Sequence, residues 1–402
     1  MHLVILYGKT GRLKDNNSYH KVFLILTFLM RDSYAIINLK NLEFNYLNLR
    51  KKVSPAKFLA VVKADAYGHG AIEVSKFLSN LIDKPEYYGV ALFKEAIELR
   101  NFNIKEPILV FNVIDLESIK IAIEYNLTFT ISHLNDYLII REYLRKNDYN
   151  VILNAHIKIN TGMNRLGIRW DTKLFELEKF FKLKNLNISG IYTHFATSDI
   201  PGNKFAQLQL KRFNDLLDKL FKRKIEIGLI HSANSGAILN MPDSYFDMVR
   251  AGISLYGYKP DLMSLDSVKL KPVMSIISKV ASVNKVRSGE SVSYGQKYFT
   301  KKNTKIASVT FGYADGYSRN LSNKAFAIIK NKSYPQVGTV TMDRVMFDIG
   351  NSRIYLGEEV ILMGQKNKLK FDAWDWSLIL NTIPYEVTCN ISKRVPRVYI
   401  RK

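Results

Sequence analysis

The chain has 402 residues, of which 47% are hydrophobic and 12% aromatic, and its formal net charge is +23. This length allows two domains of ordinary size, or one large α/β barrel and a smaller unit. The basic residues are dispersed and form no zinc-finger, arginine-rich or RNP-like motif. We therefore expect no nucleic-acid partner, and we attribute the charge to a general bias toward Lys, Asn and Ile.

The single cysteine, Cys389, excludes an intramolecular disulfide and fits the reducing environment of the cytoplasm. Near the N-terminus, the apolar run VFLILTFLM at residues 22–30 is too short to span a bilayer and has no small-residue cleavage site. We therefore expect a cytoplasmic protein with no membrane partner. Residues 1–33 are predicted to be a poorly specified N-terminal extension, and Met30 is an alternative start.

A TIM-like (β/α)8 barrel is predicted over residues 34–270. After a strand and a helix at 34–53, eight nearly continuous apolar runs follow between residues 57 and 251, as expected for buried parallel strands, and amphipathic stretches separate most of them. Eight such units favour closure into a barrel. An open doubly wound sheet is the alternative, but no GxGxxG motif follows any run. The runs are KFLAVVK, YYGVAL, PILVFNV, LTFTIS, VILNAHIKIN, LNISGIYTHF, IEIGLIH and YFDMVRA.

A mainly β domain is predicted over residues 271–402. Strand-like segments such as VMSIISKVASVNKV, KIASVTFGYA and AFAIIKN are separated there by Gly, Asn, Ser and Pro turns. Only DAWDWSLILN has a helical pattern, so a β fold follows the barrel.

Polar residues at the ends of the predicted strands indicate a site, because parallel barrels carry their active sites at the C-terminal ends of the strands. Lys63 ends a buried strand, where a lysine is costly without a partner or a function. Taken singly, these residues have ordinary explanations, such as a solvent-facing lysine, a core histidine or a surface arginine. The positions are Lys63, Lys158, Asn160, Arg165, His194, Ser235, Arg250 and Gly252.

The loops after the seventh and eighth strands point to a phosphate site. Barrels commonly hold a phosphate there, and the Ser235 hydroxyl with the backbone N–H groups of Gly252 and Ile253 would suit one. A lysine at another strand end, across the barrel mouth from a phosphate, predicts pyridoxal 5'-phosphate bound to Lys63 as a Schiff base.

Ten collinear motifs resemble bacterial alanine racemase, a pyridoxal-phosphate-dependent family of fold type III. The resemblance runs from about residue 34 to the C-terminus and does not cover residues 1–29. The motifs are AVVKADAYGHG, KINTGMNRLG, THFA, HSANS, VRAGISLYG, SVSYGQKY, GYADGYSR, VGTVTMDRV, TIPYEVTCNIS and RVPRVY.

The resemblance implies interconversion of L- and D-alanine by two bases, and a supply of D-alanine for peptidoglycan synthesis. Lys63 matches the lysine that binds the cofactor and acts on D-alanine, and Tyr294 matches the tyrosine that acts on L-alanine. Inversion needs two such groups, because a proton leaves one face of Cα and returns to the other. A phenol is a poor base at its ordinary pKa near 10, and neighbours such as His194 and Arg250 would favour the phenolate.

The other site residues are also implied by the resemblance. Arg250 matches the partner of the pyridine nitrogen, and as a guanidinium it donates without giving up its proton. Arg165 and the backbone N–H of Met342 match the contacts to the substrate carboxylate. Lys158 matches a position that is often carbamylated in the family, where it would orient Arg165. The cofactor-binding set is Lys63, Tyr67, His194, Ser235, Arg250, Gly252, Ile253 and Tyr385.

Three of the matched residues, Tyr294, Met342 and Asp343, lie in the predicted β domain. In the family they come from the partner subunit, so the resemblance implies a head-to-tail homodimer with shared active sites, and Asp343 is a supporting residue. Thr341 departs from the family pattern, because a cysteine is common at that position.

Four alternatives differ in testable features. A non-catalytic pyridoxal-phosphate-binding protein would share the barrel but lack the β domain and Tyr294. A racemase for another small amino acid, such as serine, would differ in the room beside GTVTMD and Tyr385. A basic amino-acid decarboxylase of related fold would use a cysteine in its second domain. A nucleic-acid-binding protein, suggested by the net charge of +23, is the alternative from another functional class.

Overall fold

The computed structural model describes residues 32–146 and 152–401. Residues 1–31 of the predicted N-terminal extension therefore lie outside the described residues. The chain forms two compact units. The barrel unit contains Ile37–Met274, Asp372–Ile391 and Tyr399–Lys402. The β unit contains Ser275–Phe371, Ser392–Val398 and the described residues before Ile37.

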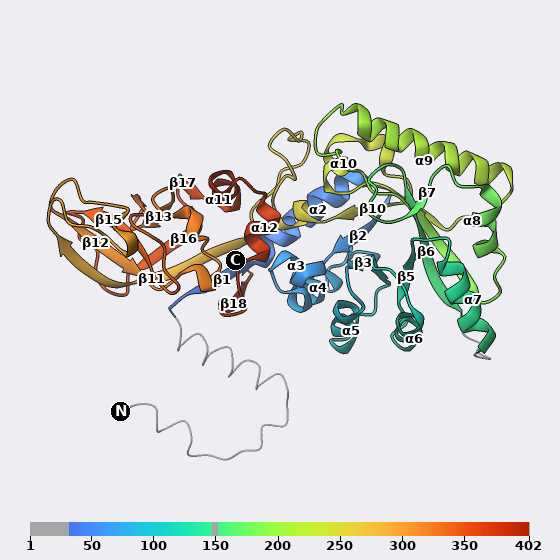
Figure 1. Cartoon of the computed structure of the whole chain (residues 1–402), viewed down its shortest axis with the longest axis horizontal. Helices are drawn as coiled ribbons and strands as arrows, with labels where there is room; N and C mark the ends of the chain where they lie inside the picture. Colours follow the sequence, from blue (N-terminus) through green and yellow to red (C-terminus); the bar gives the residue numbers. More distant parts are fainter. Residues whose placement is uncertain (1–31, 147–151, 402) are drawn as a thin grey trace, which may run out of the picture. The chain divides into compact units, whose positions relative to one another are not determined.

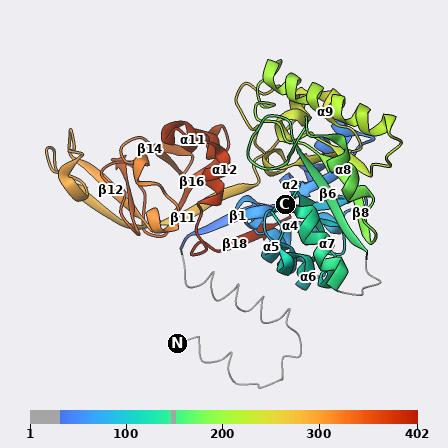
Figure 2. The same ribbon diagram turned by 45° about the vertical axis from the view of Figure 1, so that its right-hand side comes forward.

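Eight parallel strands form the barrel, with helices on its outer side (Figures 1 and 2). The strand β10 pairs with β2, so that Met248 lies opposite Lys57 and Ala251 opposite Ala60. The backbone N–H of Asp247 donates to the Ile230 carbonyl at 3.0 Å and nearly closes the ring. The predicted (β/α)8 fold is confirmed. In spatial order, the strands are β10 (Met248–Ala251), β2 (Lys57–Val61), β3 (Tyr87–Val90), β4 (Ile108–Val110), β5 (Thr128–Ile131), β6 (Leu153–Asn160), β8 (Leu186–Tyr192) and β9 (Leu229–His231).

The helices of the barrel unit follow the amphipathic stretches of the sequence. The longest, α9 (Lys204–Lys222), starts where the Asn203 side chain caps the Phe205 N–H at 2.9 Å, and it buries residues three or four positions apart, such as Phe213 and Leu217. The others are α2 (Leu39–Val53), α3 (Lys63–Tyr67), α4 (Ala71–Ser79), α5 (Phe93–Asn101), α6 (Leu116–Glu124), α7 (Asp136–Lys146), α8 (Leu174–Phe181), α10 (Ser235–Asn240), α11 (Ala373–Leu380) and α12 (Pro384–Cys389).

The pattern of the sequence did not indicate α12. This helix is short, contains the β-branched residues Val387 and Thr388, and begins at Pro384, whose fixed φ suits a first helical position. Short connecting elements complete the unit: β7 (Ile168–Arg169), η2 (Pro242–Ser244) and η3 (Ile253–Tyr256).

The β unit is built on one nine-stranded sheet, as a mainly β domain predicts. Its longest strand, β11 (Met274–Val286), pairs antiparallel with both β16 and β12, and an irregularity lies in each pairing. The other strands are β1 (Tyr34–Asn38), β12 (Thr304–Val309), β13 (Phe326–Ile329), β14 (Lys332–Pro335), β15 (Val345–Gly350), β16 (Glu359–Lys366), β17 (Leu369–Phe371) and β18 (Arg397–Ile400), with the short helices η4 (Tyr294–Gln296), η5 (Tyr313–Asp315) and η6 (Arg319–Leu321).

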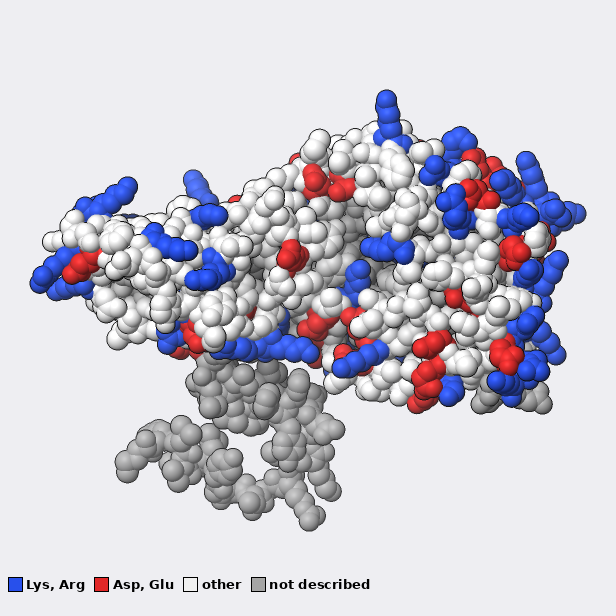
Figure 3. All heavy atoms as spheres, in the orientation of Figure 1, with Lys and Arg blue, Asp and Glu red and all other residues white. Residues whose placement is uncertain are grey.

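Charged side chains of both signs share the surface. On the face drawn in Figure 3, Lys and Arg are interspersed with Asp and Glu and form no continuous basic stripe. On α8 and α9, for example, Lys179 pairs with Glu176 at 2.7 Å and Lys211 with Asp215 at 2.9 Å. Within the described residues, no helix is long and apolar enough to cross a membrane.

A buried asparagine joins α2 to the chain that follows the last barrel strand. Asn45 is fully buried and donates from Nδ2 to the carbonyls of Leu255 at 3.1 Å and Lys271 at 2.8 Å. Its Oδ1 accepts the Lys271 N–H at 2.7 Å. These three bonds replace the water that the two backbone segments would otherwise need.

We predict that Asn45→Ala lowers the free energy of unfolding by about 2–3 kcal/mol, because it leaves buried backbone groups without partners. Urea denaturation measures the change. The matched control is Asn48→Ala on the same helix, which removes only an exposed bond to the Lys269 carbonyl and should cost less than about 1 kcal/mol. Equal losses in the two variants would contradict the role given to Asn45.

Candidate active site

A cavity of about 630 Å³ lies where the barrel strands end, a size suited to a small molecule. The sequence-predicted residues of the barrel unit other than Asn160 gather around it, although they come from segments spread over more than 300 positions of the chain. Those that line the cavity are Lys63, Tyr67, Lys158, Arg165, His194, Ser235, Arg250, Gly252, Ile253 and Tyr385.

The chain directly after Lys63 forms a left-handed helical turn. The four non-glycine residues Ala64, Asp65, Ala66 and Tyr67 have φ between 51° and 54°. For L-residues this conformation costs roughly 1–2 kcal/mol per residue, and strain of this kind collects at functional sites. The turn lets the Lys63 and Tyr67 side chains, four residues apart, line the same cavity.

Hydrogen bonds hold this strained turn in place. The Ala64 N–H donates to Glu95 Oε1 at 2.6 Å, and Glu95 Oε2 accepts from the N–H groups of Ala91 and Leu92 at 2.8 and 3.0 Å. One carboxylate therefore connects the ends of β2 and β3. Gly68, at φ +82°, closes the turn with an N–H bond to the Ala64 carbonyl at 3.0 Å.

The two cavity lysines have lowered pKa values. Burial is the main cause for Lys63, and the charge of Arg165 also lowers the pKa of its amine below the ordinary 10.5, against an opposing effect of Glu95. For Lys158, burial and then the charges of Arg165, Arg250 and Lys63 lower the pKa to about 8. A lowered pKa makes the neutral amine, the form that acts as a nucleophile or a base, more accessible in both lysines than in an ordinary lysine.

Arg250 is a buried charge with neutral partners. Its Nη2 donates to the carbonyls of Thr193 at 2.7 Å and Ser232 at 2.8 Å, and its Nη1 contacts His231 Nδ1 at 2.8 Å. Among the described residues, no carboxylate forms an ion pair with it. Burial lowers the pKa of Arg250 from 12.5 to about 10, which still leaves a guanidinium at neutral pH.

The histidines next to Arg250 are neutral acceptors. A guanidinium has no acceptor atom, so His231 Nδ1 and His194 Nδ1, which lies 3.2 Å from Nη2, must both accept. Burial first, and the charge of Arg250 second, hold the pKa of both histidines well below 6.5. His231 then donates from Nε2 to His156 Nδ1 at 2.8 Å, deep in the barrel.

Another part of the cavity wall is a close-packed group of hydroxyls around a glycine. A Cβ on Gly252 would lie 2.5 Å from Tyr67 Oη, so only glycine fits there. The Gly252 N–H donates to Ser235 Oγ at 2.9 Å, at the start of α10. Helix α12 brings Tyr385 to 5.7 Å from the Tyr67 ring.

These groups fit pyridoxal phosphate. The Lys63 amine has a lowered pKa, the Arg250 guanidinium has no carboxylate partner among the described residues, and the backbone at Gly252 lies close to the Tyr67 and Ser235 hydroxyls. An aldehyde, a ring nitrogen and a phosphate are the groups that such a donor set would receive.

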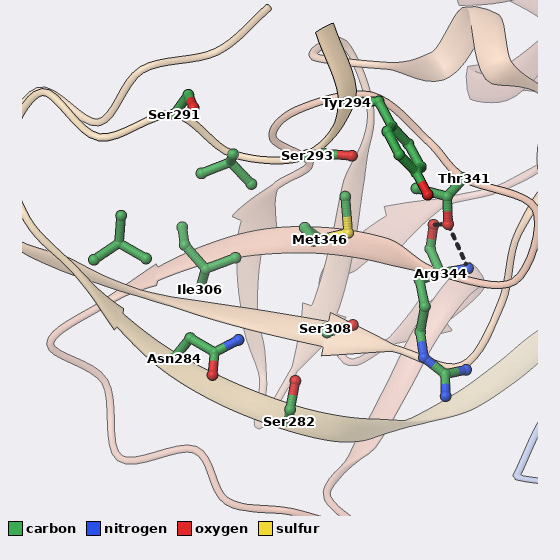
Figure 4. A pocket seen from close by; sticks show the side chains of 12 residues that line it. Ser282, Asn284, Ser291, Ser293, Tyr294, Ile306, Ser308, Thr341, Arg344 and Met346 are labelled. Carbon is green, nitrogen blue, oxygen red and sulfur yellow. Dashed lines mark hydrogen bonds between the residues drawn. The ribbon is translucent and has the colours of Figure 1, made fainter. Parts of the chain in front are cut away.

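The three site residues predicted from the later sequence, Tyr294, Met342 and Asp343, lie in the β unit. Tyr294 is 71% exposed and lines a second cavity of about 620 Å³, together with Thr341 and Arg344 (Figure 4). Met342 is half exposed, and Asp343 pairs with Arg394 at 2.8 Å.

Sequence analysis did not identify Glu95, His231 or Tyr256 as part of this site. Glu95 stands at the third position of α5, where a carboxylate caps backbone N–H groups, and this position was an available signal. His231 is the first residue of the quoted HSANS motif. Tyr256 stacks on His69 at 4.5 Å and donates to the Val61 carbonyl at 2.9 Å, and it lies within the quoted VRAGISLYG motif.

We predict that Lys63 in the cofactor-free protein is labelled by formaldehyde and cyanoborohydride, and that the extent of labelling against pH has its midpoint below pH 10.5. The reason is that a lowered pKa leaves the amine neutral at lower pH. Peptide mass spectrometry at a series of pH values measures it. Arg165→Ala should raise the midpoint toward 10.5, since it removes a like charge. A midpoint at 10.5 in both proteins would contradict the electrostatics described above.

Family models and known relatives match the sequence of this chain. Residues 37–260 match the model described as "Alanine racemase, N-terminal domain", and residues 273–399 match "Alanine racemase, C-terminal domain". The alanine racemase of Carboxydothermus hydrogenoformans is 38% identical over 373 residues, which cover 92% of this chain and 100% of that protein.

Solved structures agree in fold. That of the Clostridium difficile 630 alanine racemase is 36% identical with a TM-score of 0.86, over 92% of this chain and 96% of that one. The Bartonella henselae alanine racemase, solved with covalently bound pyridoxal phosphate, is 27% identical with a TM-score of 0.81, over 92% and 99%. The chain therefore belongs to the alanine racemase family, and its enzyme class is that of an amino-acid racemase, an isomerase.

Proposed function

We propose that this protein interconverts L-alanine and D-alanine with pyridoxal phosphate in the barrel cavity, and so supplies D-alanine for peptidoglycan synthesis. The observation that carries the proposal is the pairing, in one cavity, of a lysine of lowered pKa with a buried arginine that has no carboxylate partner among the described residues. Membership in the family indicates which reaction to expect, and the residues of the cavity have the chemical groups that this reaction needs.

The barrel residues would hold the cofactor at three points. Lys63 would hold its aldehyde carbon and Arg250 its ring nitrogen. The phosphate would lie among Tyr67, Ser235, Gly252, Ile253 and Tyr385. When bound, the cofactor supplies an electron sink that makes the Cα–H bond of an amino acid acidic.

Lys63 serves one face of Cα. Its lowered pKa favours the neutral form of Nζ relative to an ordinary lysine, and the neutral amine can take a proton from D-alanine or return one to the same face. Arg250 keeps its guanidinium proton, since its pKa is about 10, so a ring nitrogen bound to it stays unprotonated. His194 is neutral, and its Nδ1 accepts from Arg250, so its Nε2–H would be the group that donates a hydrogen bond to the second base without adding charge.

The substrate carboxylate would be bound by Arg165 and by the backbone N–H of Met342. Lys158 supports Arg165: an amine of pKa about 8 is partly neutral at neutral pH, and the neutral form adds carbon dioxide with loss of a proton. The resulting carbamate would be an anion beside Arg165 and would hold its guanidinium in place. Asp343 stays in a supporting role beside Met342.

Tyr294 serves the other face of Cα, and the β domain predicted as residues 271–402 supplies it. We propose that it acts in the site of a second copy, in a head-to-tail homodimer with shared active sites. The exposure of Tyr294 and Met342 on the β unit supports this assembly, since exposed site residues are available to a partner. The predicted cytoplasmic location is also a proposal, supported by the lone Cys389.

We predict that Tyr294→Phe reduces racemisation by 10²–10⁴-fold, on the order expected for a lost acid/base group. In deuterated water, D-alanine should still exchange its α-proton without inverting, because Lys63 remains, while L-alanine stays largely protiated. Chiral chromatography with mass spectrometry measures both, and Lys63→Ala should abolish both exchanges. Equal exchange into the two enantiomers of Tyr294→Phe would assign the second face to another residue.

We predict that two inactive variants restore activity when their subunits are mixed. A dimer of one Lys63→Ala and one Tyr294→Phe subunit would have one site with both defects and one intact site. Random exchange after mild denaturation and refolding should therefore recover roughly a quarter of wild-type activity. Each variant refolded alone is the control. No recovery, with heterodimers verified by mass, would exclude shared sites.

A further inference from the structure

The residue before Tyr294 has a backbone conformation that side chains rarely adopt. Ser293 has φ 67° and ψ −171°, a region that is essentially reserved for glycine. The next residues continue the irregularity, since Gly295 and Gln296 also have positive φ, of 74° and 49°. Such a turn persists only where its surroundings over-determine it, so the contacts of Ser293 indicate what fixes it.

Two crossed hydrogen bonds fix the turn to a neighbouring segment. Ser293 Oγ donates to the Thr339 carbonyl at 2.6 Å, and Thr339 Oγ1 donates to the Tyr294 carbonyl at 2.7 Å. Each residue thus holds the backbone of the other chain segment. Figure 4 shows Ser293 and Tyr294 side by side at the edge of the second cavity. Thr339 itself is buried, so water does not compete strongly for its hydroxyl.

The segment that carries Thr339 is itself immobilised. The N–H of Gly338 donates to Asn323 Oδ1 at 2.7 Å, and the Gly338 carbonyl accepts from the buried Gln336 Nε2 at 2.9 Å. The N–H of Val340 donates to Ser322 Oγ at 3.0 Å. These bonds make residues 338–340 a fixed platform.

Close packing leaves the turn no room to shift on this platform. Gly338, at φ +75°, lies so near that a Cβ on it would meet the Val292 carbonyl oxygen at 2.5 Å and Ser293 Cβ at 3.0 Å. The platform continues directly to Met342, whose carbonyl accepts the Ala314 N–H at 3.2 Å. The loop of Tyr294 and the loop of Met342 are therefore joined as one body.

We propose that Ser293 and Thr339 are positioning residues for Tyr294. Their crossed hydrogen bonds hold the phenol in the one orientation that reaches Cα, and they couple it to the backbone that would bind the substrate carboxylate. This inference rests on the proposed function, in which Tyr294 is the second base. Neither side chain touches the substrate; each acts through the backbone of the Tyr294 turn.

The test compares variants that remove or keep one hydroxyl. Thr339→Val keeps the shape and removes the donor to Tyr294, whereas Thr339→Ser keeps the donor. Ser293→Gly removes the second bond and also relieves the strained φ, so it remains informative if Thr339→Val folds poorly. Ser308→Ala, in the same cavity, is the matched control, because no hydrogen bond from its hydroxyl supports the turn.

In deuterated water with added pyridoxal phosphate, Thr339→Val and Ser293→Gly should lose racemisation and α-proton exchange of L-alanine by on the order of 10²-fold, the scale of a small misplacement of a reacting group. Exchange of D-alanine should stay within about twofold of wild type, since Lys63 is untouched. Thr339→Ser and Ser308→Ala should match wild type. In the cofactor-free protein, amide exchange of the peptide at 291–299 should quicken in the two impaired variants alone.

Full exchange of L-alanine in both Thr339→Val and Ser293→Gly would overturn the inference. Equal loss of exchange for the two enantiomers would also overturn it, because it would mean a general structural role. Failure of the wild-type protein to exchange either enantiomer would instead reject the proposed function, and the inference that rests on it.

Discussion

The crowding of four cationic side chains around one cavity, with no carboxylate ion-pair partner among the described residues, governs the barrel site. Lys63, Lys158, Arg165 and Arg250 all line it, and within the described residues none forms an ion pair with a carboxylate. Burial first, and repulsion by neighbouring cations second, lower the pKa of both lysines. Such a site selects anionic ligands, and a phosphate and a carboxylate are the two anions that the proposed reaction brings.

The same crowding separates the roles of chemically similar groups. Arg250 stays charged because its partners are two backbone carbonyls and neutral imidazoles, which hold its orientation without neutralising it. Lys63 gives up charge more readily, so it can act as a nucleophile and a base. The left-handed turn after Lys63 is strained, and this strain destabilises the fold. The carboxylate of Glu95 offsets part of the strain by accepting three backbone hydrogen bonds.

The β unit also contains a strained turn, and this turn orients Tyr294. Tyr294 is exposed on its own unit, where the turn that carries it has a fixed direction. A non-glycine residue in a glycine conformation and two crossed hydrogen bonds provide it. Both proposed bases are thus attached to short, strained turns whose geometry depends on neighbouring chain segments.

Sequence by itself determined the eight buried strands, the mainly β second domain and the family, because nearly continuous apolar runs and ten collinear motifs are local properties. It also identified Lys63, Arg250 and Ser235 from their places at strand ends. Tertiary structure alone decided the left-handed turn after Lys63, the support from Glu95, and the fact that α12 belongs to the barrel unit and brings Tyr385 to Tyr67. These features depend on contacts between distant segments, and neither residue propensity nor hydrophobic period carries information about such contacts.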